Sequence, residues 1–196
     1  MKKFIYVLPL LLALGILFAC SNKKANDEKK GPEPTAMDTV KRGEYLVTIM
    51  GCHDCHSPKN VTPQGATLIT DRLLSGYQAD KPAAKPTGSC VKNGWALITM
   101  DLTTAAGPWG QSFSANLTSD QTGIGNWTLE NFTRAVKEGK FKGLEGSRIL
   151  LPPMPWQNFA VIEDDDLHAI YAYLKSTKPI NNVVPAPIPP TELGIK

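Results

Sequence analysis

Two cysteines and two histidines stand together in the segment Cys52-His53-Asp54-Cys55-His56. The spacing C-x-x-C-H is the attachment signature of a c-type haem. On a tight turn, two thiols three residues apart can form thioether bonds with the two vinyl groups of one haem. The next residue then offers a ring nitrogen to the iron. We therefore predict that Cys52 and Cys55 attach one haem covalently and that His56 is an axial iron ligand.

Two other interpretations of this motif compete with haem attachment. A structural zinc site needs four ligands, and beyond the motif only Cys90 and His168 remain once Cys20 is assigned to lipid attachment, as predicted below. A thioredoxin-like dithiol is expected near a βαβ pattern, whereas a helical pattern precedes this motif. For a haem ligand, the second ring nitrogen of His56 should donate to a backbone carbonyl, and we predict Pro58 or Pro63 as the acceptor.

The second axial ligand is predicted to be Met154. It lies in the segment Leu150-Leu151-Pro152-Pro153-Met154-Pro155-Trp156. Three prolines stiffen the backbone around the thioether and lower the entropy cost of holding it at the iron. The alternatives are that Met154 only fills the core, or that Met100 is the ligand. His168 is a weaker alternative, because it lies off the apolar stripe of its helix.

The amino-terminal segment predicts export. Lys2 and Lys3 precede fifteen apolar residues, 4–18, which suits a signal peptide and is too short for a comfortable transmembrane helix. The following Ala19-Cys20 resembles the bacterial lipobox. We predict a lipoprotein signal peptide over residues 1–19 and lipid attachment at Cys20; an ordinary signal peptide cut near Ala19 is the alternative.

Composition indicates a nearly neutral exported protein with a spacer after the lipid. Without Lys2 and Lys3, 19 of the 21 basic residues remain against 18 acidic residues, so the net charge is about +1. The sequence has no basic stripe of the kind that binds nucleic acid. Residues 20–37 are polar and predict a flexible tether. Cys90 is left over; we expect a buried, inert thiol, with intermolecular pairing or reactivity as the alternative.

Apolar periodicity predicts helices over residues 39–50, 129–138 and 164–175. Thr128 can cap the second helix and Gly139 can end it. The long segment between the first two helices predicts a small β excursion, with a hairpin turn at Asn93-Gly94 between strands at 90–92 and 95–102. After Pro179, a proline-rich tail should lie extended over the surface.

These blocks together resemble the class I cytochromes c, above all the cytochrome subunits of bacterial membrane-bound alcohol, aldehyde and gluconate dehydrogenases. The resemblance covers about Val40 to Pro190 and rests on four segments: Arg42–Leu46 leading into the C-x-x-C-H motif, Ser114–Thr118 with Thr122–Thr128, Pro152–Trp156, and Asp166–Leu174. It implies that the first and last helices cross at Gly43, with Val47 near Ile170 and Tyr173, and that Met154 is the distal ligand. Asn116, Trp127 and Arg148 are predicted either to contact haem propionates or to be structural.

The resemblance implies a mainly α, class I cytochrome c-like domain over residues 38–190 around one covalent haem c, with a small β or loop insertion and a tail at 191–196. Those subunits usually carry several haem motifs, whereas this sequence has one. We expect an electron carrier, not an enzyme, that is anchored by lipid in the cell envelope and faces the periplasm. Redox proteins such as a dehydrogenase or a terminal oxidase are its expected partners. A peroxidase, another small-molecule oxidoreductase, or a sensor with a displaceable Met154 are the alternatives.

Overall fold

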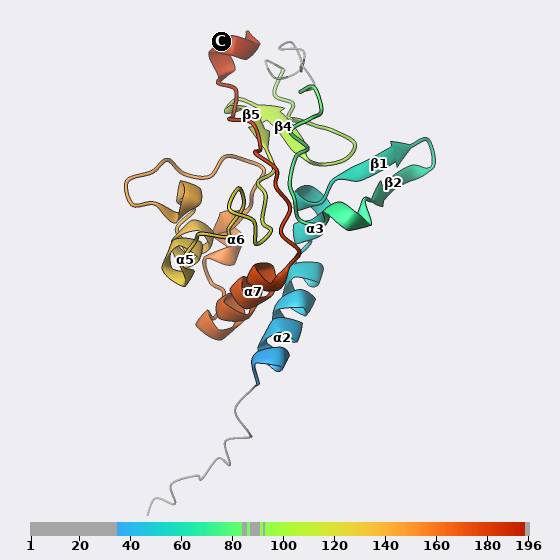
Figure 1. Ribbon diagram of the computed structural model, residues 1–196. Helices are drawn as coiled ribbons and strands as arrows, with labels where there is room; N and C mark the ends of the chain where they lie inside the picture. Colours follow the sequence, from blue (N-terminus) through green and yellow to red (C-terminus); the bar gives the residue numbers. More distant parts are fainter. Residues whose placement is uncertain (1–34, 84–85, 87–90, 92, 195–196) are drawn as a thin grey trace, which may run out of the picture. The chain divides into compact units, whose positions relative to one another are not determined.

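The computed structural model describes residues 35–83, 86, 91 and 93–194 (Figure 1). The predicted signal peptide, Cys20 and Cys90 lie outside the described residues. The helices are α2 (Ala36–Ile49), α3 (Cys52–His56), α5 (Leu129–Lys137), α6 (Trp156–Phe159) and α7 (Asp164–Ser176). The strands are β1 (Lys59–Thr62), β2 (Gly65–Leu68), β3 (Leu97–Ile98), β4 (Thr104–Gly107) and β5 (Gly110–Phe113), and three 3₁₀ turns are η1 (Thr70–Arg72), η2 (Phe141–Gly143) and η3 (Pro190–Leu193).

Helices α2 and α7 pack against each other (Figure 1), and Gly43 allows their close approach. A Cβ atom at position 43 would lie 1.9 Å from the carbonyl oxygen of Ala169 and 2.7 Å from the Cβ of Tyr173. The crossing at Gly43 that the resemblance implies is therefore confirmed. The Arg42 guanidinium spans the same contact and donates to both carboxylate oxygens of Asp166, at 2.8 and 3.0 Å.

Helix α2 begins at Ala36, three residues before the predicted start and inside the stretch predicted as tether. Thr35 and Asp38 form a capping box, in which the Thr35 hydroxyl accepts from the Asp38 amide and the Asp38 carboxylate accepts from the Thr35 amide. These reciprocal bonds satisfy two amides of the first turn. The polar composition of this stretch therefore concealed a local start signal.

Helix α5 follows the predicted cap and stop signals. The Thr128 hydroxyl accepts from the Asn131 amide, and Gly139 follows the helix with φ +66°. Phe132 and Ala135 of this helix are buried, whereas Leu129 at its start is 38% exposed.

The excursion between α3 and α5 contains more β structure than a mainly α fold with a small insertion implies. Strands β1 and β2 form a hairpin, and β3, β4 and β5 form a second antiparallel sheet. The hairpin predicted at Asn93-Gly94 is wrong, because β3 pairs with β4 across the turn at 99–103. Asn93 and Gly94 do form a turn, but residues 90 and 92 of the predicted first strand lie outside the described part.

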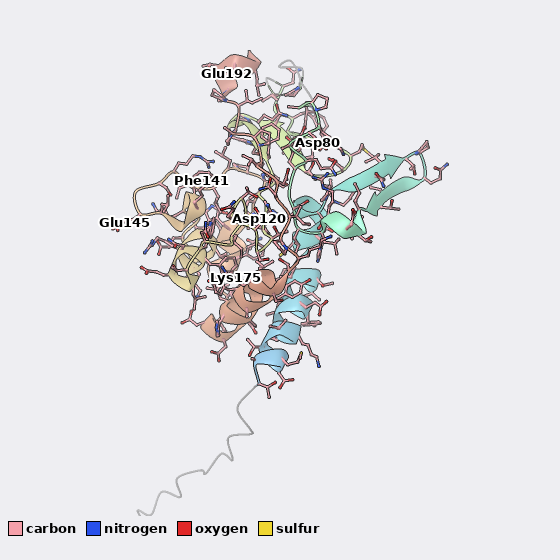
Figure 2. All side chains as sticks on the ribbon, viewed as in Figure 1. Asp80, Asp120, Phe141, Glu145, Lys175 and Glu192 are labelled. Carbon is pink, nitrogen blue, oxygen red and sulfur yellow. The ribbon has the colours of Figure 1, made fainter. Side chains whose placement is uncertain are left out.

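The hydrophobic core lies where α2, α5, α7 and two loops meet. Its buried members are Leu46, Val47, Leu74, Ile124, Phe132, Leu167, Ala169, Ile170 and Leu174. Lys175, at the end of α7, donates to the carbonyl of Gly125 in the loop that also carries Asp120 (Figure 2). This bond fixes the loop that supplies Ile124 to the core.

The proline-rich tail runs without regular structure from α7 to η3, as predicted. Its Asn182 is buried at 4% exposure, and Ile188 pairs with Gln111 of β5 through two backbone hydrogen bonds of 2.8 and 2.9 Å. No helix in the described part of the chain has the length and apolarity that crossing a membrane requires.

Candidate haem site

The predicted attachment residues lie on one short helix. Gly51 (φ +69°) makes the sharp bend that separates α2 from α3, and α3 consists of the five residues Cys52–His56. Both thiols are free and partly buried. Burial raises the pKa of Cys52 to about 11 and raises the pKa of Cys55 as well. Both sulfurs are thus protonated at neutral pH in the free protein.

His56 is held from two sides. Its ring Nδ1 lies 2.8 Å from the carbonyl oxygen of Ala115, and its own carbonyl accepts from the amide of Gly76 at 2.8 Å. Because a carbonyl oxygen only accepts, Nδ1 carries the proton and Nε2 is the nitrogen available to a metal. Burial lowers the pKa of His56, although the bond to Ala115 opposes this shift. The ring is therefore neutral, the form in which histidine binds metals.

The expected carbonyl partner of His56 thus exists, but neither Pro58 nor Pro63 provides it. Ala115 is 59 residues away and follows β5. The carbonyl of Pro58 instead accepts from the amide of Ile69 at 3.0 Å. The sequence contains no signal for such a partner, because every residue carries a carbonyl.

A second set of bonds fixes the turn that follows the motif. The Ser57 hydroxyl is fully buried, accepts from the amide of Leu74 at 2.8 Å and lies 2.9 Å from Nδ1 of His53. This contact engages the His53 ring with Ser57. The motif is therefore tied to the loop at Leu74, whose side chain belongs to the core.

Two buried asparagines connect the tail to the two loops that contact His56, which carry Gly76 and Ala115. The Asn182 amide nitrogen donates to the carbonyls of Ser75 and Tyr77, at 2.7 and 2.8 Å. The Asn116 amide nitrogen donates to the carbonyl of Ile180 at 2.8 Å, and its oxygen accepts from Thr118. These bonds favour the structural interpretation of Asn116.

The predicted distal ligand Met154 is partly buried, in a loop anchored at both ends. Before it, the carbonyl of Pro152 accepts from the Ser112 hydroxyl of β5 at 2.6 Å. After it, Trp156 packs so closely on Gly139 that a Cβ there would lie 2.4 Å from the indole. The alternative ligands are placed differently: Met100 is 74% exposed, and His168 is exposed on α7.

Strand β5 and its continuation contact both predicted ligand segments. Ser112 holds the backbone two residues before Met154, and Ala115 holds the ring of His56. The two predicted axial ligands, 98 positions apart in the sequence, are thus attached to one four-residue stretch. Neither Ser112 nor Ala115 was predicted as a site residue, although Ala115 lies in the Ser114–Thr118 segment on which the resemblance rests.

The other propionate candidates have structural contacts. The Arg148 guanidinium lies 4.0 Å from the centre of the Phe141 ring and donates to the carbonyl of Ile149. Trp127 packs against the core, and its carbonyl accepts from the Tyr171 hydroxyl. Their contacts with propionates stay predictions.

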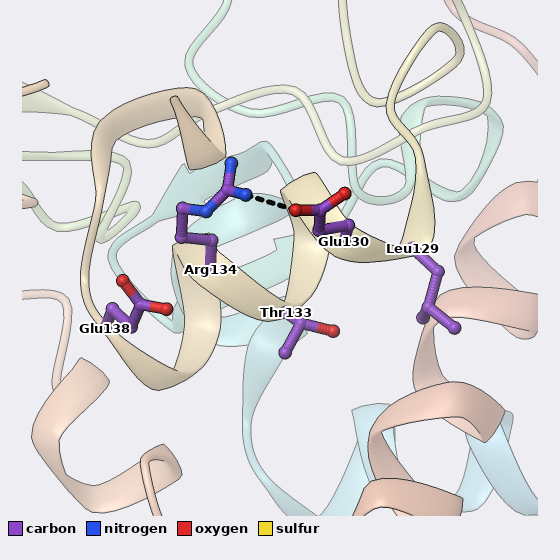
Figure 3. A pocket seen from close by; sticks show the side chains of 5 residues that line it. All are labelled: Leu129, Glu130, Thr133, Arg134 and Glu138. Carbon is purple, nitrogen blue, oxygen red and sulfur yellow. Dashed lines mark hydrogen bonds and ion pairs between the residues drawn. The ribbon is translucent and has the colours of Figure 1, made fainter. Parts of the chain in front are cut away.

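A hollow over α5 contains no candidate haem ligand. It is lined by Leu129, Glu130, Thr133, Arg134 and Glu138, and it contains an ion pair between Glu130 and Arg134 (Figure 3). Within the described residues, no three His, Cys, Asp or Glu side chains gather into a metal-binding group. The zinc interpretation therefore gains no support there.

Comparison with known proteins identifies the family. No family model matches the chain. The chain is 31% identical over 167 residues to the gluconate 2-dehydrogenase cytochrome c subunit of Pantoea cypripedii, a match that covers 84% of this chain and 27% of that protein. It is 27% identical over 180 residues to the fructose dehydrogenase cytochrome subunit of Gluconobacter japonicus, covering 91% and 29%. The chain is a relative of the cytochromes c.

A third match supports the same family. The cytochrome c subunit of alcohol dehydrogenase (quinone) from Gluconobacter oxydans is 30% identical to this chain over 143 residues. The match covers 72% of this chain and 22% of that subunit. The chain thus spans less than a third of the length of these relatives. Its donor set, two neutral thiols followed by a neutral imidazole with a free Nε2, fits a covalently attached haem.

Proposed function

We propose that this protein is a monohaem c-type cytochrome that carries single electrons between redox proteins. The observation that carries the proposal is the arrangement of α3, where two free thiols precede a histidine whose Nδ1 is engaged by the Ala115 carbonyl. The relationship to cytochrome c subunits supports it. A haem bound there would supply one-electron chemistry through its iron.

Each residue has a separate role in this proposal. Cys52 and Cys55 hold the macrocycle covalently, and His56 presents Nε2 in a fixed orientation because its other nitrogen is engaged. Met154 supplies the second axial ligand, on a loop that Ser112 tethers. A His/Met pair leaves the iron no vacant position for a substrate, and methionine ligation raises the reduction potential. Electron transfer therefore suits this donor set better than peroxidase or sensor chemistry.

The relatives suggest the kind of partner. Their names place them in gluconate, fructose and alcohol dehydrogenases. We propose that a dehydrogenase, or an oxidase downstream of one, exchanges electrons with this cytochrome. The sequence-based prediction of a lipid on Cys20 adds attachment to an envelope membrane, with the domain on the periplasmic side.

Covalent attachment is tested by extraction. Acid–organic solvent should leave one haem per chain on the wild-type protein, because thioether bonds survive it. Replacing both Cys52 and Cys55 with Ala should leave either extractable haem or apoprotein. Freely extractable haem in the wild type would contradict the proposed attachment.

Axial ligation is tested by Met154→Ala, with Met100→Ala as the matched control. The wild-type ferric protein should show the weak near-infrared thioether-to-iron band and bind carbon monoxide slowly, or not at all, when reduced. Met154→Ala should abolish the band, lower the potential and admit exogenous ligands, whereas the exposed Met100 should be replaceable without effect. Rapid ligand binding by the wild type, without the band, would favour a peroxidase or a sensor.

A further inference from the structure

Lys59 is a buried cation beside the haem-attachment helix, and the roles above do not use it. Its side chain is 9% exposed although it begins the otherwise exposed strand β1. Lysine is among the residues most rarely buried, because removing an ammonium from water is costly unless its protons are bonded. Its burial therefore requires specific partners.

The Lys59 ammonium has three carbonyl acceptors. Its Nζ donates to the carbonyl oxygens of Asp54 at 2.5 Å, Ser57 at 3.1 Å and Asp101 at 2.9 Å. A protonated lysine has three donors, so this set matches the charged form. Among the described residues, the hydrogen-bond partners of Nζ are carbonyl oxygens. The carboxylates of Asp101 and Asp54 attract the ammonium without a hydrogen bond to it.

The three acceptors come from functionally distinct segments. Asp54 lies between the two attachment cysteines in α3, and Ser57 directly follows His56. Asp101 belongs to the turn between β3 and β4. Lys59 therefore fastens the middle of the haem-attachment helix and the residue that follows it to the β excursion.

We propose that Lys59 is a positioning residue for the haem-attachment helix and that its buried charge raises the reduction potential of the iron. This inference rests on the proposed haem site. A positive charge close to the iron favours the reduced state, because reduction lowers the positive charge of the centre. Burial keeps that interaction from being screened as it would be at the surface.

Lys81 provides the matched control. The Lys81 ammonium lies 3.8 Å from a carboxylate oxygen of Asp101, but the Lys81 side chain is 43% exposed. Lys59→Met and Lys81→Met therefore remove the same charge from one neighbourhood, once from a buried and once from an exposed position. Lys59→Gln is a second neutral variant that keeps polar hydrogen-bonding capacity.

The experiment is a spectroelectrochemical titration of the full-length holoprotein, after covalent haem has been verified in the wild type. We expect Lys59→Met to lower the equilibrium constant for reduction about tenfold, which is about 59 mV for a one-electron couple. Lys81→Met should produce less than a third of that shift. Lys59→Gln should shift the potential in the same direction as Lys59→Met.

The outcomes separate the two proposals. A wild type without covalent haem would overturn the proposed function itself. Covalent haem with an unchanged potential in a neutral Lys59 variant, or an equal shift in Lys81→Met, would overturn only the role of Lys59. If neither neutral variant retains haem, Lys59→Arg decides. Covalent haem in Lys59→Arg, at a reduction potential near that of the wild type, supports the proposal that a positive charge is required at this position. Loss of haem from Lys59→Arg overturns the proposal.

Discussion

Removing the Ser112 hydroxyl should loosen the predicted iron–methionine bond. Ser112 donates to the carbonyl of Pro152 at 2.6 Å and accepts from the Trp109 indole nitrogen at 3.3 Å. Ser112→Ala removes both hydrogen bonds, and each contributes about 0.5–1.5 kcal/mol, so the loss is about 1–3 kcal/mol. Part of this cost falls on the loop conformation that presents Met154.

The magnitude follows from a two-state treatment of the loop. An exogenous ligand reaches the iron only when Met154 has dissociated, so its apparent affinity scales with the population of the open state. If about 1.4 kcal/mol of the lost stability acts on the closed loop, the apparent affinity rises about tenfold. The ferric protein should therefore bind imidazole about tenfold more tightly in Ser112→Ala, as measured by titration of the near-infrared band.

Ser119→Ala is the control for general destabilisation. The Ser119 hydroxyl donates to the carbonyl of Thr177 at 2.5 Å, which is the same kind of bond between segments distant in the sequence. It should lower the unfolding free energy without changing imidazole affinity. An equal rise of affinity in both variants, or no rise in Ser112→Ala, would refute the tethering role of Ser112.

Three further predictions concern the helix contact, acid stability and the anchor. Gly43→Ala should lower the free energy of unfolding, measured by thermal denaturation, by about 1–3 kcal/mol. The clash of the new Cβ with the Ala169 carbonyl outweighs the roughly 1 kcal/mol gain in helix propensity. Lys41→Ala, at an exposed position of the same helix, should change the free energy of unfolding by less than about 0.5 kcal/mol. Burial alone would raise the pKa of Asp101, but hydrogen bonds from neighbouring threonines outweigh burial and hold the pKa below its usual value. The carboxylate therefore stabilises the fold above about pH 4, and this stabilisation is lost as the pH falls through the folded pKa. Acid unfolding of Asp101→Asn should lack this pH-dependent contribution. Cys20→Ala should release the protein from membranes in fractionation with covalent haem intact, and retention in high salt would contradict anchoring at Cys20.

The sequence predicted those features that local residues determine. Thr128 and Gly139 delimit α5 because a cap and a left-handed residue act within one helical turn. The same local chemistry at Thr35 was missed because the surrounding charges resembled a tether.

The contacts around the candidate site were beyond sequence reasoning for a different reason. The acceptor for His56 is a backbone carbonyl at Ala115, and any residue could have provided it. The pairing of β3 with β4 likewise depends on tertiary context, since a good turn dipeptide at Asn93-Gly94 was available nearby. Non-local partners of this kind become visible only in the folded chain.

The bonds of Asn182 have a consequence for the order in which the protein assembles. The attachment helix is five residues long, whereas Asn182 contacts Ser75 and Tyr77 across 107 and 105 positions. Closing such long loops is entropically costly, so non-local contacts form late in folding. The turn of α3, by contrast, needs only contacts between neighbouring residues. The loop next to His56, whose Gly76 amide donates to the His56 carbonyl, therefore reaches its final conformation only together with the tail.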